Sequence, residues 1–147
     1  MYESLTCLIP ALQNGQAGEW IVDRKNDGTK EHPIQFPFVS YGDAACKLIE
    51  EIHRFAEKHP EFELNQYQTI LEKKRNEQGC DSVWAMDVDQ LDGKTVTALL
   101  LGAARAERFS EGTLLHFCKD GSVVKWLKRL KELDEGRQKH GAGLPAP

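Results

Sequence analysis

The chain has 147 residues, of which 40% are hydrophobic and 29% charged, and its formal net charge is -4. This length suits one domain with one hydrophobic core, and the composition is that of an ordinary globular protein. The acidic balance lacks the basic footprint that favours nucleic acid, and no apolar run approaches the roughly 18 residues of a membrane-spanning helix. We therefore expect partners other than nucleic acid or a membrane.

The chain carries no recognisable signal for export, for a metal or for a cofactor. Its N-terminal segment lacks the basic and hydrophobic regions of a signal peptide. The cysteines are widely scattered and form no Cys-x-x-Cys pair, so we expect reduced thiols and a cytoplasmic location. Three acidic residues, Asp87, Asp89 and Asp92, resemble a calcium loop, but the twelfth position would be Ala98 rather than glutamate. We interpret them as helix caps.

Helical periodicity runs through most of the chain. Leu5, Leu8, Ile9 and Leu12 predict a first helix over 3–14, although Pro10 would remove one of its hydrogen bonds. Five further helices are predicted by the spacing of apolar residues, at about 42–58, 64–77, 90–109, 113–119 and 122–135.

Two short β-like runs lie between the first and second predicted helices. They are Trp20–Val22 and Ile34–Phe36, and Asn26-Asp27-Gly28 between them is a turn signal. The pattern predicts a small β-hairpin near residues 19–38. Pro33 and Pro37 would confine the second strand to an edge.

The run from Val96 to Ala104 is apolar almost all the way round, which is typical of a helix at the centre of a domain. We therefore predict a mainly α protein: a five- to six-helix single domain over residues 1–135 around this central helix, with a flexible tail at 136–147. The alternative is an α+β fold in which residues 80–86 join a sheet of three or more strands.

Charged residues gather where the central helix ends. Helical geometry points Glu107 to the same side as Val96 and Leu100, so we expect it to be buried beside a basic side chain. Arg105 and Arg108 lie one turn apart on another flank, and guanidinium groups suit planar anions. Two interpretations follow, a structural ion-pair network or a pocket for a small anion. The candidate ligand site comprises Arg105, Glu107, Arg108, Phe109 and Gly112, with Trp126 and Tyr67 as aromatic walls.

Several segments resemble an uncharacterised bacterial and phage family, domain of unknown function 6508. The resemblance covers roughly residues 15–135, and its most specific part is the signature Arg105-Ala-Glu-Arg-Phe109 with the glycine that follows. Further similar segments are Gly18–Asp23, Pro33–Val39, Leu64–Leu71 and Val124–Leu130. The family implies no established activity.

Two classes of function remain open from the sequence. The first is a non-catalytic binding or protein-interaction module of a bacterial or phage cytoplasmic protein, acting as a homodimer, with a protein partner or on a small anionic ligand. The alternative is a small hydrolase or transferase acting on an anionic substrate held by Arg105 and Arg108. No catalytic residue is assigned.

Overall fold

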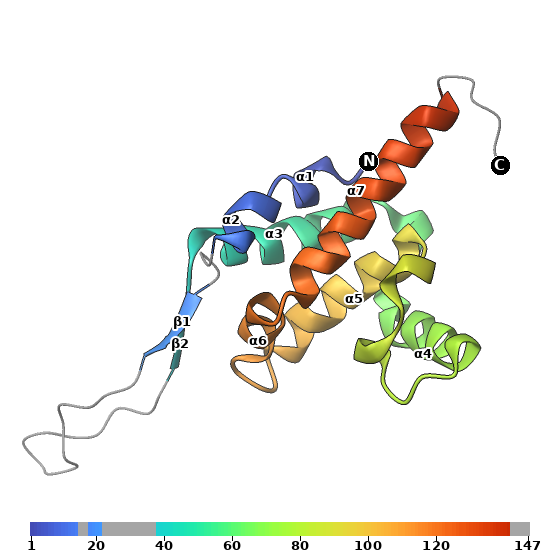
Figure 1. Ribbon diagram of the computed structural model, residues 1–147. Coiled ribbons are helices and arrows are strands. Elements are labelled where there is room, and N and C mark those ends of the chain that lie inside the picture. The colour runs from blue at the N-terminus through green and yellow to red at the C-terminus, as the bar shows by residue number, and fades with distance from the viewer. Residues whose placement is uncertain (15–17, 22–37, 142–147) are drawn as a thin grey trace, which may run out of the picture.

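A computed structural model describes residues 1–14, 18–21 and 38–141 of the chain. The protein is 74% helical, and a two-stranded ribbon projects from the helical body (Figure 1). The predicted mainly α fold with a small hairpin is therefore confirmed. No helix in the described part of the chain combines the length and the apolar character needed to cross a membrane.

Helix α5, Gly93–Ala106, is the centre of the protein. Every residue from Thr95 to Ala104 is buried, as its apolar sequence predicts. Helices α3, α4, α6 and α7 all contact it. Because no side of α5 is polar, its neighbours must cover it all round, and the hydrophobic effect therefore sets the arrangement of the body.

The helices around α5 each bury one face. They are α3 at Asp43–Lys58, α4 at Tyr67–Gln78, α6 at Thr113–Lys119 and α7 at Ser122–Gly141. Buried side chains recur at helical spacing in α7, at Val123, Trp126, Leu127 and Leu130. Helix α7 extends to Gly141, whereas the sequence predicted an end near residue 135.

The first predicted helix is broken into two. Helix α1 spans Glu3–Thr6 and α2 spans Ile9–Gln13. Pro10 lies in the first turn of α2, where its missing N–H needs no helical partner. The proline thus starts a new helix instead of kinking one long one. Both helices pack against α3 and α7.

The segments on either side of α4 consist of short turns. Four 3₁₀ turns occur there, η1 at Pro60–Phe62, η2 at Leu64–Gln66, η3 at Val83–Ala85 and η4 at Val88–Gln90. The alternative α+β architecture is wrong for the described residues, because residues 80–86 form η3 and its flanks rather than a strand.

The ribbon pairs β1, Gly18–Ile21, with β2, Phe38–Tyr41, in antiparallel register. Gly18 faces Tyr41, and Ile21 faces Phe38. The expected turn at 26–28 and the expected strand at 34–36 lie outside the described residues. Strand β2 begins after Pro37, which cannot donate a ladder hydrogen bond.

Asp92 caps the N-terminus of α5. Its carboxylate accepts hydrogen bonds from the Thr95 N–H at 2.9 Å and the Thr95 hydroxyl at 2.6 Å. Burial acts to raise the pKa of Asp92, but the bonds from Thr95 outweigh it and hold this pKa below its ordinary value.

We expect Asp92→Ala to lower the free energy of unfolding by about 1 kcal/mol at neutral pH, because the central helix loses its cap. Since the folded pKa is depressed, this contribution is present above pH 3.8, the ordinary value, and disappears as pH falls through the folded pKa. Urea unfolding of both proteins at neutral and acid pH measures the difference. Asp89→Ala is the control, because that exposed side chain caps no helix in the described part of the chain. Equal losses from the two variants would contradict the assignment.

Candidate functional site

Helix α5 ends at Ala106, and a tight turn over residues 107–112 leads into α6. The N–H groups of Phe109 and Ser110 both donate to the Ala106 carbonyl. Gly112 closes the turn with a φ of 95°, a left-handed conformation that glycine adopts without strain. The turn reverses the chain and places Phe109 on its outside.

The Glu107 carboxylate holds the turn together. Its oxygens accept hydrogen bonds from the N–H of Gly112 at 3.0 and 3.1 Å and from the N–H of Leu114 at 3.1 Å. Gly112 offers no side chain to cap α6, so the Glu107 carboxylate takes the place of a capping side chain at the Leu114 N–H and complements the helix dipole. The Tyr41 hydroxyl also hydrogen-bonds Glu107, and burial together with this bond raises the pKa of Tyr41.

Our expectation of a buried Glu107 beside a basic residue is therefore wrong for the described residues. Glu107 is half-buried, and its partners there are backbone amides and a tyrosine. Its side chain points from the end of α5 toward the start of α6. The sequence pattern did not reveal that the next helix would present unpaired N–H groups to it.

Three contacts tie the ribbon to this turn. The Tyr41 hydroxyl accepts a hydrogen bond from the Leu115 N–H at 3.2 Å and thus contacts both α6 and Glu107. The Glu111 carboxylate accepts one from the Val39 N–H at 2.8 Å. The Trp20 ring lies so close to Gly112 that a Cβ there would come within 2.3 Å of it.

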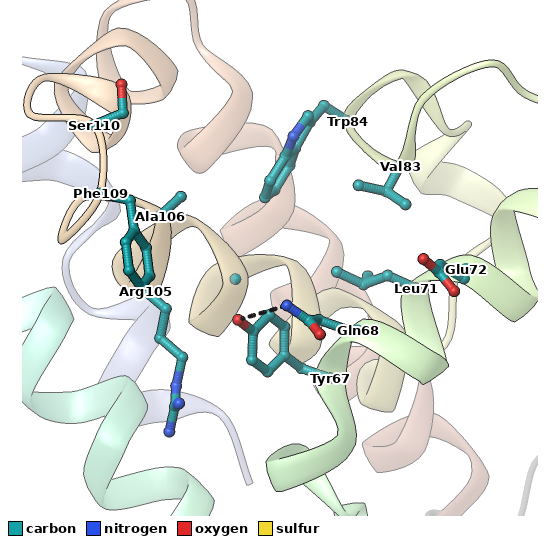
Figure 2. A pocket seen from close by; sticks show the side chains of 11 residues that line it. Tyr67, Gln68, Leu71, Glu72, Val83, Trp84, Arg105, Ala106, Phe109 and Ser110 are labelled. Atoms are coloured by element: carbon teal, nitrogen blue, oxygen red, sulfur yellow. Dashed lines mark hydrogen bonds between the residues drawn. The ribbon is translucent and has the colours of Figure 1, made fainter.

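A cavity of about 530 Å³ opens on the other side of the turn (Figure 2). It lies between α4, η3 and the end of α5. Eleven residues line it: Tyr67, Gln68, Leu71, Glu72, Val83, Trp84, Gly102, Arg105, Ala106, Phe109 and Ser110. Most of the lining is apolar, with a guanidinium and a carboxylate among the few charged groups.

Aromatic rings form the walls of this cavity. Figure 2 shows Trp84 and Tyr67 on opposite sides of the opening, with Phe109 beside Arg105. The rings lie close to α5 at Gly102, since a Cβ there would lie 3.4 Å from both Trp84 and Tyr67, in van der Waals contact. Phe109 is 91% exposed, an unusual position for a large apolar side chain next to a cavity.

The two arginines have different surroundings. The Arg105 guanidinium lies over the Tyr67 ring, 5.6 Å from its centroid, which is a cation–π geometry. Arg108 is exposed and does not line the cavity. The cavity therefore includes only one of the two predicted guanidiniums, because the regular helix α5 ends at Ala106, before Arg108.

The two predicted aromatic walls lie in different places. Tyr67 lines the cavity, whereas Trp126 is 2% exposed and lies behind Trp84, with a ring distance of 6.0 Å. Trp84 is the wall that the sequence interpretation missed. The sequence held one sign of this position, because a serine such as Ser82 can cap a short turn. The Ser82 hydroxyl accepts a hydrogen bond from the backbone N–H of Trp84 at 3.2 Å.

The candidate residues thus separate into three groups. Arg105, Phe109 and Tyr67 line the cavity, Glu107 and Gly112 form the capped turn behind it, and Arg108 and Trp126 belong to neither. In the described part of the chain, no cluster of three or more His, Cys, Asp or Glu side chains could hold a metal ion.

The geometry describes a mainly helical protein with an aromatic cavity at the end of its central helix. Residues 2–136 match the family of unknown function DUF6508, and the chain belongs to this family. Neither a curated protein nor a solved structure matches it significantly.

We expect Glu107→Gln to lower the free energy of unfolding by about 1–3 kcal/mol, because the new amide group would turn a donor toward the N–H groups of the turn. Glu111→Gln is a matched control in the same turn, since that exposed carboxylate accepts a single hydrogen bond from the residues that the structure describes. Thermal unfolding of the three proteins gives the comparison. An unchanged melting temperature for Glu107→Gln would remove the carboxylate from this structural role.

Proposed function

We propose that this protein is a non-catalytic interaction module and that the cavity at the end of α5 is its binding site. The observation that carries the proposal is Phe109, which is 91% exposed at the edge of an aromatic cavity beside the Arg105 guanidinium. A large exposed apolar ring normally lowers the solubility of a protein. Covered by a partner, it would stabilise the complex by about 1.5–3 kcal/mol.

The chemistry of the lining defines what the cavity would receive. A volume of about 530 Å³ falls within the range of ligand-binding pockets. The aromatic walls favour a flat apolar group, and Arg105 favours a negative charge attached to it. Stacking on Tyr67 holds the guanidinium in place before a partner arrives. We therefore infer that the occupant presents an apolar ring together with a carboxylate or a similar anion.

The alternative, a hydrolase or transferase, has less support. It requires Arg105 and Arg108 to hold one substrate, but only Arg105 lines the cavity. The sole lining carboxylate, Glu72, is exposed, and no histidine, cysteine or lysine is among the lining residues that the structure describes. Elsewhere, burial raises the pKa of the Cys118 thiol to about 11, so this thiol stays protonated at neutral pH.

The composition supports a proposal for the partners and the cellular location of the protein. We propose that its partners do not include nucleic acid, because the net charge is -4. Four free cysteines suit a reducing cytoplasm.

Phenylacetate is a minimal probe of the cavity, because it combines one ring with one carboxylate. We expect millimolar binding, the affinity usual for so small a molecule, and a shift of the Trp84 indole N–H signal in an NMR titration of dilute protein. Uncharged phenylacetamide should bind about 10-fold more weakly, since it loses the charge-assisted hydrogen bond. Arg105→Gln should remove the preference for the acid.

Arg108→Gln is the matched control, because Arg108 is an exposed arginine one turn further on that does not line the cavity. It should keep the preference for phenylacetate. Equal binding of the acid and the amide by the unaltered protein, or no shift of the Trp84 signal, would overturn the assignment of the site.

A further inference from the structure

We propose that the occupant of this cavity is a second copy of the same chain. The two copies form a two-fold symmetric dimer in which Phe109 of each enters the cavity of the other. This inference rests on the proposed function, because it names the partner of the same site.

The projecting ring and the cavity lie on one face of the protein. Both belong to the end of α5, where Phe109 is 91% exposed and also contributes to the rim. A two-fold interface uses the same patch on both copies, so the patch must complement itself. A ring next to a cavity of about 530 Å³ meets this condition, because the rotation places each ring opposite the other copy's opening.

The charges at the cavity also complement themselves. Arg105 comes from α5 and Glu72 from α4, and Figure 2 shows them at opposite ends of the lining, with Tyr67 between them. A two-fold rotation reverses this order, so the Arg105 of each copy faces the Glu72 of the other. Within the described residues of one chain, neither side chain has an ion-pair partner.

The turn that carries Phe109 is held in position before association. Glu107 fixes it through the Gly112 and Leu114 amides, and Glu111 anchors it to the ribbon at Val39. A rigid projection loses little conformational entropy on binding, which favours its use as an anchor. Trp84 and Tyr67 offer it aromatic faces, and ring pairs of this kind add to the gain from burial.

Sedimentation equilibrium from about 10 μM to about 1 mM tests the dimer directly, since this range brackets a weak interface. We expect the unaltered protein to approach twice the mass of one chain as its concentration rises. Phe109→Ala should weaken association at least about 100-fold, because two anchoring rings are lost at once. Circular dichroism checks that this variant keeps its helices.

A charge-reversal pair tests the geometry. Arg105→Glu leaves only acids at the two positions, and Glu72→Arg leaves only bases, so each variant alone should dimerise at least about 10-fold more weakly. An equimolar mixture restores both ion pairs and should recover dimers close to the level of the unaltered protein. Arg108→Glu makes the same charge change outside the cavity and should dimerise normally.

Three results would overturn the dimer: a strict monomer up to about 1 mM, a dimer that Phe109→Ala leaves intact, or a charge-reversed mixture that associates no better than its components. The phenylacetate titration separates this failure from failure of the proposed function. A monomer that binds phenylacetate keeps the site and requires a different molecule as its partner. A dimer that phenylacetate dissociates supports both proposals.

Discussion

The burial of α5 on all sides is the constraint on which the rest of the structure depends. A helix without a polar face cannot lie at a surface, so α3, α4, α6 and α7 must surround it. This enclosure stops where α5 stops. After Ala106 the chain enters the turn over residues 107–112, and the aromatic cavity lies at that edge. The site thus forms where the hydrophobic core ends.

One carboxylate links the end of the core to the ribbon. The Glu107 carboxylate accepts hydrogen bonds from the N–H groups of Gly112 and Leu114 and is hydrogen-bonded to the Tyr41 hydroxyl of β2. The same turn exposes Phe109 on its outer side. The ribbon and the cavity therefore share the turn over residues 107–112. A displacement of the ribbon at Tyr41 would change the position of the cavity wall. A half-buried acid that accepts backbone hydrogen bonds suits this position, because it stabilises a helix N-terminus without needing a cation.

The fold was predictable where a periodic pattern determines it. The apolar run of α5 required a central position, and the spacing of buried residues in α3 predicted both of its ends to within about one residue, well inside the usual boundary error. The site was predictable in part, because its residues depend on irregular backbone. Arg108 follows the end of α5, so helical angles misplaced it. Trp84 reaches the cavity through the short turn capped by Ser82, and such turns leave no periodic signal.

Gly102 couples the stability of the central helix to the depth of the cavity. A glycine inside a helix costs about 1 kcal/mol relative to alanine, yet here it leaves open the space between α5 and the rings of Trp84 and Tyr67. The methyl group of an alanine at this position would favour the helix and make the cavity shallower. A single substitution at Gly102 would therefore exchange stability against the depth of the site while the other lining residues stayed the same. Variation among relatives at this position would then record how large a group each of them accommodates.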